Sequence, residues 1–306
     1  MTEQDSRDTS RASGGAGAQA PDESAVKAAI EEEAARFAGS ADNASPVDGE
    51  RLFAPPFFGY AAGDDPAWRT LSSGAVECSW TPLEAFRLGI PDSSASASDL
   101  TVVSAVLPAT PETTGDQAAT ERFPAARWLA SRHSHGRSVD GLARCLASRL
   151  GSMGIERVVP DHLPSFRTLR HPVHVFTSTW SHRHAAWAAG LGTFGLSEGL
   201  ITRAGVAHRL TSVIVRARLA PTPRTYAGFR DWCLFYSSGK CGKCIGRCPP
   251  GAISAGGHDK ELCRSYANDV VRPWAAARFP DMEGAYACGL CQAGVPCASR
   301  APGAGD

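Results

Sequence analysis

Eight cysteines crowd into the last quarter of this 306-residue chain, and this distribution constrains the fold more than any other feature. Of the ten cysteines, only Cys78 and Cys145 lie before residue 233. A large cysteine-poor region therefore precedes a small cysteine-rich module. No export signal is visible at the N-terminus, so we expect a cytoplasmic protein whose cysteines are metal ligands or catalytic thiols rather than disulfides.

The spacing of these cysteines is typical of iron–sulfur modules. The run CLFYSSGKCGKCIGRCPPGAI reads C-x7-C-x2-C-x3-C-P, and a bacterial ferredoxin motif reads C-x2-C-x2-C-x3-C-P. Ser238 stands where the first ferredoxin cysteine would be, and Cys233 is the available substitute. The eight thiols, enough for two [4Fe–4S] clusters, are Cys233, Cys241, Cys244, Cys248, Cys263, Cys288, Cys291 and Cys297.

Zinc is the alternative, because C-x2-C pairs also form tetrahedral zinc sites. Zinc ribbons use two such pairs, whereas a C-x2-C-x3-C-P run followed by Pro-Gly-Ala-Ile indicates a ferredoxin-type module. We interpret the two isolated cysteines, Cys78 and Cys145, as buried inert thiols.

The pattern of the remaining chain predicts mixed secondary structure. Helices are expected at 24–39 with Ser24 as N-cap, at 139–154 and at 181–189 with Ser181 as N-cap. Strands are expected at 100–108, 171–179 and 209–219, and loops at 94–99 and 111–120. Because strands and helices intermingle before residue 220, an α/β or α+β layer fold follows.

Composition divides the chain into four parts. The Ser/Gly-rich residues 1–23 are expected to be a disordered tail, and the Pro-rich stretch 220–229 a linker. We therefore predict a domain at 24–228, a cysteine-rich domain at 229–300 and a tail at 301–306.

Charge and hydropathy exclude several partners. Lysines and arginines balance the acids at 31 each, which argues against general DNA binding, and no apolar run is long enough to span a membrane. The stretch 201–250 is locally basic. We interpret it chiefly as a solvated face that balances the acidic N-terminus. The alternatives are that it docks an acidic electron donor, holds phosphate or amide groups of a corrinoid, or binds RNA.

A glycine-rich stretch and a group of histidines precede the cysteines. Gly190, Gly192 and Gly195 form GLGTFG after a predicted helix, whereas a phosphate-binding GxGxxG follows a strand. The glycines indicate either close approach of a flat or bulky group or a tight loop in the core. His182 and His184 are candidate proton donors, with a structural role as the alternative. His133 and His135 are expected in a loop.

The segments AAGLGTFGLSEGLIT, CGKCIGRCPPGAI, CRSY and ACGLCQ together resemble the epoxyqueuosine reductases and their relatives, the reductive dehalogenases. The resemblance runs from about Thr179 to Cys297. It implies an α+β fold, with a nitroreductase-like α/β sandwich domain that binds cobalamin and a ferredoxin-like module with two [4Fe–4S] clusters. Electrons from a ferredoxin- or flavodoxin-type donor would pass through the clusters to cobalt and reduce a small molecule or modified nucleoside.

The resemblance also implies which residues serve which group. Cys233, Cys241, Cys244 and Cys297 would hold one cluster, and Cys248, Cys263, Cys288 and Cys291 the other. The residues expected to face the corrinoid are Gly190, Gly192, Thr193, Phe194, Gly195, His208, Arg209 and Ser212.

This chain also departs from the family pattern. The stretch Phe176–Trp180 has no carboxylate where the reductases carry an acidic proton donor, and His182 precedes Arg183 where the family usually has a glutamate. These departures keep a second hypothesis open, namely a cobalamin-independent ferredoxin-type protein that passes electrons to a protein partner.

Overall fold

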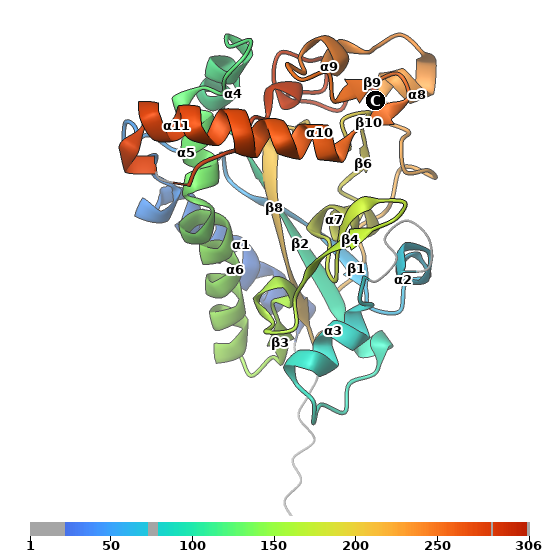
Figure 1. Cartoon of the computed structure of the whole chain (residues 1–306). Helices are drawn as coiled ribbons and strands as arrows, with labels where there is room; N and C mark the ends of the chain where they lie inside the picture. The colour runs from blue at the N-terminus through green and yellow to red at the C-terminus, as the bar shows by residue number, and fades with distance from the viewer. Residues whose placement is uncertain (1–21, 73–78, 283, 305–306) are drawn as a thin grey trace, which may run out of the picture.

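The computed structural model describes residues 22–72, 79–282 and 284–304 (Figure 1). Most of the predicted disordered tail 1–23, and Cys78, lie outside these residues. The first helix, α1 (Glu23–Gly39), begins one residue earlier than predicted, and its N-cap is Asp22 rather than Ser24. The Asp22 carboxylate accepts a hydrogen bond from the backbone N–H of Ala25, which an N-cap side chain is expected to do.

A four-stranded antiparallel sheet forms the centre of the molecule, in the order β1–β2–β8–β3. Its strands are β1 (Phe57–Ala62), β2 (Thr101–Pro108), β3 (Arg157–Val158) and β8 (His208–Val215). Every residue of β2 is buried, which explains why the sequence there is continuously apolar rather than alternating. The strands predicted at 100–108 and 209–219 are thus confirmed as β2 and β8.

Helices cover both faces of this sheet (Figure 1). On one face, Val103 and Val213 pack with α1 and with α6 (His135–Ser152). On the other face, Val102 and Ile214 pack with α7 (His182–Ala188) and α3 (Pro82–Gly89). Successive strand residues point to opposite faces, so neighbouring valines enter different cores. The predicted α+β class is confirmed.

Shorter elements complete the architecture. Two of them are hairpin-like pairs, β4 (Thr168–His171) with β5 (Val175–Ser178) and β6 (Gly192–Phe194) with β7 (Leu200–Thr202). The others before residue 220 are η1 (Ala41–Asn43), α2 (Ala67–Thr70), η3 (Ala97–Asp99), α4 (Pro111–Ala118), α5 (Ala126–His133) and η4 (Pro160–His162). The C-terminal ones are α8 (Leu234–Ser238), α9 (Lys243–Gly246), β9 (Ile253–Ser254), β10 (Gly257–His258), α10 (Lys260–Ser265), η5 (Tyr266–Val271), α11 (Arg272–Arg278), η6 (Pro280–Met282) and η7 (Leu290–Gln292).

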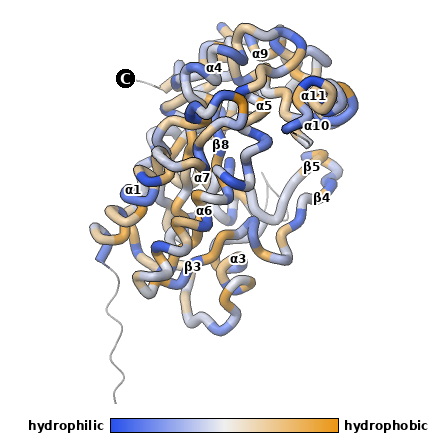
Figure 2. Tube along the Cα trace, turned by 90° about the vertical axis from the view of Figure 1, so that its left-hand side faces the viewer, coloured by the Kyte–Doolittle hydropathy of each residue, from blue (hydrophilic) through white to orange (hydrophobic). Residues whose placement is uncertain are grey.

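The cysteine-rich segment lies across one end of the sheet. In Figure 2 the helices α4, α9, α10 and α11 occupy this end, and the β4–β5 hairpin lies beside α10. Lys260 of α10 donates a 2.9 Å hydrogen bond to the His174 carbonyl between the two hairpin strands. Val271 and Ala275 enter the same apolar core as α1 and α6. Core packing thus connects the cysteine-rich segment to the rest of the chain, and the division at residue 228 stays a prediction.

Three local predictions were wrong for identifiable reasons. Residues 111–118 form α4 instead of a loop, because Thr110 caps a helix that Pro111 can start. The strand expected at 171–179 is part of the β4–β5 hairpin, whose second strand starts at Val175 with a φ of 62°. His133 and His135 end one helix and begin the next rather than lying in a loop.

Cys145 is exposed on α6, so its interpretation as a buried thiol was wrong. The buried stripe of this helix includes Leu142 and Leu146, and Cys145 falls outside it. No helix among the described residues has the length and apolarity that crossing a bilayer requires.

Candidate metal centres

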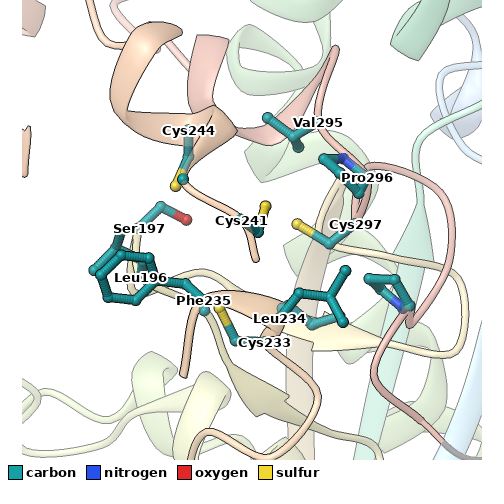
Figure 3. A pocket seen from close by; sticks show the side chains of 14 residues that line it. Leu196, Ser197, Cys233, Leu234, Phe235, Cys241, Cys244, Val295, Pro296 and Cys297 are labelled. Carbon is teal, nitrogen blue, oxygen red and sulfur yellow. The ribbon is translucent and has the colours of Figure 1, made fainter. Parts of the chain in front are cut away.

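Four of the cysteines line one pocket. Cys233 precedes α8, Cys241 and Cys244 lie at the start of α9, and Cys297 lies near the C-terminus. Figure 3 shows their sulfur atoms around the same space. Leu196, Phe235 and Pro296 are among the apolar residues that complete the wall. The structure therefore brings together the four cysteines that the resemblance assigns to one cluster.

The helix α8 explains the long spacing between Cys233 and Cys241. It inserts a single turn after Cys233 and ends at Gly239, whose φ of 66° turns the chain back toward the pocket. Ser238, at the position of the missing ferredoxin cysteine, donates a hydrogen bond to the Leu234 carbonyl within this turn. The insertion is thus a folded element, and Cys233 reaches the pocket despite it.

The remaining four cysteines form a second group. Cys248 follows α9, Cys263 lies on α10, and Cys288 and Cys291 flank the start of η7. Burial raises the pKa of the Cys291 thiol, and the charges of Cys288, Cys263 and Cys248 raise it further, so Cys291 interacts electrostatically with all three. Cys244 of the first group adds to this effect, so the two groups are neighbours.

A glycine with a left-handed backbone shapes the second group. Gly289 has a φ of 64° between Cys288 and Leu290, and a Cβ atom there would lie 2.0 Å from Nε1 of Trp128. The buried Trp128 of α5 thus packs directly against the backbone between two thiols. No other residue type fits this position without displacing the indole ring.

The spacing of the thiols bears on which metal they could hold. Within the described residues, the one group of three or more His, Cys, Asp or Glu whose ligand atoms all lie within 4.8 Å contains no cysteine. Four sulfurs at 2.3 Å from one zinc ion would lie about 3.8 Å apart. A cubane holds its thiolates farther apart, because each one binds a different iron. The observed arrangement is therefore wider than a Cys₄ zinc site.

Burial also determines the chemistry of these thiols. It raises the pKa of Cys244 to about 11, of Cys288 to about 11 and of Cys297 to about 12, and neighbouring cysteines contribute to each shift. Four thiolates in one apolar pocket are unfavourable unless a bound cation or cluster compensates their charge. The donor set therefore fits a positively charged iron core.

Arg247 holds the second group against the rest of the fold. Its guanidinium donates to the carbonyls of Leu290 and Ala293 beside Cys291, at 3.3 and 3.1 Å. It also donates to the carbonyls of Gln117 and Thr120 at the end of α4, at 3.0 and 2.6 Å. The sequence analysis counted Arg247 only as part of a basic stretch, because nothing local reveals these distant partners.

Gln117 adds a further contact between α4 and the second group. Its amide donates a 2.8 Å hydrogen bond to the Cys288 carbonyl, and its own side-chain oxygen accepts from the Ala125 N–H. Gln117 is fully buried, so these bonds are shielded from water. Together with Arg247, it makes α4 part of the support for the second group.

Of the two candidate proton donors, His182 lies in a polar network. Its Nε2 lies 3.0 Å from Oδ2 of Asp161, and its Nδ1 lies 2.9 Å from Oγ of Ser212. Trp180 donates to the same hydroxyl at 2.9 Å, so Ser212 can donate its proton to His182 Nδ1. Asp161 supplies the carboxylate that the local sequence around His182 lacks, and sequence reasoning missed it because it lies 21 positions upstream.

His184 is the weaker of the two candidates. Burial, with Arg183, Lys260 and His174, lowers its pKa to about 3, so the ring is neutral at pH 7. Its Nδ1 lies 2.7 Å from Oγ of Ser181, and its ring packs against Phe194. These contacts are those of a structural histidine.

The glycines of GLGTFG are used for contacts within the chain. Gly190 has a φ of 74°, and a Cβ atom on Gly192 would lie 2.1 Å from the Ile201 carbonyl of the paired strand. Thr193 is fully buried and accepts a hydrogen bond from the Trp232 N–H. Phe194 is also buried, whereas Gly195 lines the pocket of the first four cysteines.

The three predicted corrinoid contacts on β8 also have partners inside the protein. His208 lies 2.7 Å from the Leu200 carbonyl through Nε2, and burial lowers its pKa to about 4. Arg209 donates to Ser131 at 3.2 Å and lies over the Trp128 ring. Ser212 is bound to Trp180 and His182, whereas His208 Nδ1 and Arg209 Nε have no hydrogen-bond partner among the described residues.

Much of the basic stretch is neutralised locally. Arg216, Arg218 and Arg224 pair with Glu156, Asp99 and Asp65, respectively. None of these acids belongs to the acidic N-terminal 50 residues, so the balance predicted between the two regions is not made through these three arginines. Lys240 and Lys243, beside the first four cysteines, remain exposed.

Comparisons with known proteins returned solved structures only. No protein-family model and no curated protein matches the chain. A catabolic reductive dehalogenase aligns at 17% identity and a TM-score of 0.46, over 87% of this chain and 35% of its own. Epoxyqueuosine reductase from Bacillus subtilis aligns at 17% identity and a TM-score of 0.44, over 90% of this chain and 66% of its own.

A second structure of epoxyqueuosine reductase, with an epoxyqueuosine-modified tRNA stem loop, aligns at 17% identity and a TM-score of 0.47, again over 90% and 66%. The chain thus spans about a third of the dehalogenase and just under two thirds of the reductase. These are the two kinds of enzyme whose motifs the sequence resembles.

Proposed function

We propose that this protein is an iron–sulfur oxidoreductase that holds two [4Fe–4S] clusters, one in each group of four cysteines. The observation that carries the proposal is the sorting of eight thiols into two adjacent groups. Cys233, Cys241, Cys244 and Cys297 surround one pocket, and Cys291 interacts electrostatically with Cys248, Cys263 and Cys288. Two such clusters supply one-electron steps at low potential when they are bound.

The surroundings of the two groups favour electron transfer over a structural role. Cys244 and Cys291 are close enough for their charges to interact, so the two clusters would be neighbours. The exposed Lys240 and Lys243 flank Cys241 and would attract an acidic donor of the ferredoxin or flavodoxin type. Electrons would therefore enter at the first group and pass to the second.

The electron acceptor is the second half of the predicted function, and the hydrogen bonds of the predicted corrinoid contacts bear on it. A corrinoid, implied by the resemblance, would have to contact residues that are buried and hydrogen-bonded within the chain, such as Thr193 and His208. In this arrangement the Thr193 hydroxyl and His208 Nε2 are already used by the chain itself, and this favours the cobalamin-independent alternative. A reaction of the epoxyqueuosine-reductase type stays an expectation from the motifs.

The cluster proposal is tested by anaerobic purification and analysis of iron and acid-labile sulfide. We expect about eight of each per chain. Cys297→Ser should reduce both to about four by emptying the first group, and Cys263→Ser should do the same for the second. Cys145→Ser is the matched control, since this thiol is exposed on α6 and should change nothing. Zinc without sulfide in the wild-type protein would refute the proposal.

The acceptor is tested by adding cobalamin to the cluster-loaded protein. A base-off spectral change that Thr193→Val abolishes would support a corrinoid acceptor at the predicted loop. Reducible clusters without any cobalamin-dependent change, at any concentration, would leave electron transfer to a protein partner as the function.

A further inference from the structure

A third candidate metal site lies away from the cysteines, between α6 and η4. Asp140 of α6 and Asp161 and His162 of η4 bring their ligand atoms within 4.8 Å of one another. We propose that these three residues bind one divalent first-row transition metal ion. The proposal does not rest on the function proposed above, because none of the three residues is part of either group of cysteines.

Each carboxylate is held from one side by a histidine. His135 Nε2 lies 3.3 Å from Asp140 Oδ1, and His182 Nε2 lies 3.0 Å from Asp161 Oδ2. The second oxygen of Asp161, Oδ1, is buried and has no hydrogen-bond partner among the described residues. Hydrogen bonds from outer side chains commonly orient the ligands of metal sites, and here they leave a carboxylate oxygen free to bind.

The charges of the cluster also call for a cation. Two carboxylates lie side by side, and their ordinary pKa values leave both ionised at pH 7. Among the described residues, the salt bridges of Asp140 and Asp161 involve histidines and no lysine or arginine. A bound divalent ion would neutralise both carboxylates at once.

The ligand types and access decide which ion fits. Two carboxylate oxygens and one imidazole nitrogen suit ions such as Mn²⁺, Fe²⁺ and Zn²⁺. Ligands about 2.0–2.2 Å from one ion lie at most about 4.4 Å apart, and the three ligand atoms lie within 4.8 Å of one another. His162 is exposed, so an ion can enter from solvent.

Occupation of the site would have a structural consequence. The ion would connect α6 to η4, which follows the edge strand β3. It would also fix Asp161 and, through it, the ring of His182. Asp161 would thus be both a metal ligand and the residue that positions His182.

The test uses the full-length, cluster-loaded protein after dialysis against a chelator, with Mn²⁺ as the probe. Mn²⁺ prefers oxygen and imidazole ligands over thiolates, so exposed Cys145 does not compete for it. The disappearance of the free-ion EPR signal measures binding. We expect one Mn²⁺ per chain, and at least about tenfold weaker binding in each of Asp161→Asn and His162→Gln.

Two control variants match these changes. His133→Gln and Asp92→Asn alter an exposed histidine and an exposed aspartate outside the cluster and should leave the affinity unchanged. His162→Gln keeps the test valid if Asp161→Asn unfolds, because His162 is exposed. The proposal is overturned if the wild type binds no Mn²⁺ at about 1 mM, a concentration that fills even weak protein sites. It is equally overturned if both ligand variants bind as tightly as the wild type.

Discussion

Replacing Gly289 by alanine is the sharpest perturbation that the structure offers for the second group of cysteines. Gly289 has a φ of 64°, and an added Cβ atom would lie 2.0 Å from Trp128 Nε1. A side chain in the left-handed region costs about 1–2 kcal/mol. Overpacking in a closely packed site costs about 1–3 kcal/mol more. We therefore expect Gly289→Ala to lower the free energy of unfolding by about 2–5 kcal/mol.

Gly239→Ala separates the two contributions. Gly239 has a nearly identical φ of 66°, but a Cβ atom there would meet no atom within 4 Å. This variant should therefore lose only the backbone part, about 1–2 kcal/mol. Both variants are measured by chemical denaturation of the cluster-loaded protein, with iron content as a second readout.

The two variants should also differ in iron content. Gly289→Ala should lose iron from the second group, because Cys288 and Cys291 flank the displaced backbone, whereas Gly239→Ala should keep it. Equal losses of stability in the two variants would refute the contact between Gly289 and Trp128 as the cause.

Three further predictions concern buried polar groups. Burial holds the pKa of His208 at about 4 in the folded protein, whereas the ordinary pKa of histidine is near 6.5. Below pH 6.5 the unfolded chain therefore binds more protons than the folded protein, and the free energy of unfolding should fall by about 2 kcal/mol between pH 7 and pH 5. Denaturation of His208→Gln should lack that part of the loss; an unchanged pH dependence would contradict it. Arg247→Met should lower the free energy of unfolding by about 3 kcal/mol and release iron from the second group, because four carbonyls lose their donor. Arg247→Lys should restore neither the stability nor the iron content. Asn43 is fully buried with three backbone hydrogen bonds, so Asn43→Ala should cost about 3 kcal/mol. Asn268→Ala should cost little, because the two hydrogen bonds of Asn268 are exposed to solvent. Similar shifts of the two variants in a thermal melt would be the contrary result.

Local sequence patterns predicted the elements whose signals are short-range. The apolar run at 100–108 predicted β2, and the helical pattern after residue 139 predicted most of α6. These succeeded because a continuous apolar run and a periodic apolar stripe each reflect burial of one segment. The helix α4 also carried its signal in Thr110 and Pro111, but the polar residues after them were given more weight.

The cysteine spacing predicted which residues form the candidate metal centres, because thiols a few residues apart can meet only around one loop or turn. The resemblance to known enzymes then suggested how eight thiols divide into two groups. Neither source indicated that α8 would fill the gap between Cys233 and Cys241.

Only the tertiary structure decided the contacts between distant segments. Asp161 meets His182, Arg247 reaches the end of α4, and Trp128 packs on Gly289, although each pair is separated by 21 or more positions. Similarly, the GLGTFG sequence alone does not reveal whether its glycines face a cofactor or a paired strand. The structure places Gly192 against Ile201. The amino-acid sequence by itself determined the residue types available for chemistry and the local elements that carry them. Packing decided which of them meet, because a side chain's partner depends on how the whole chain buries its apolar surface.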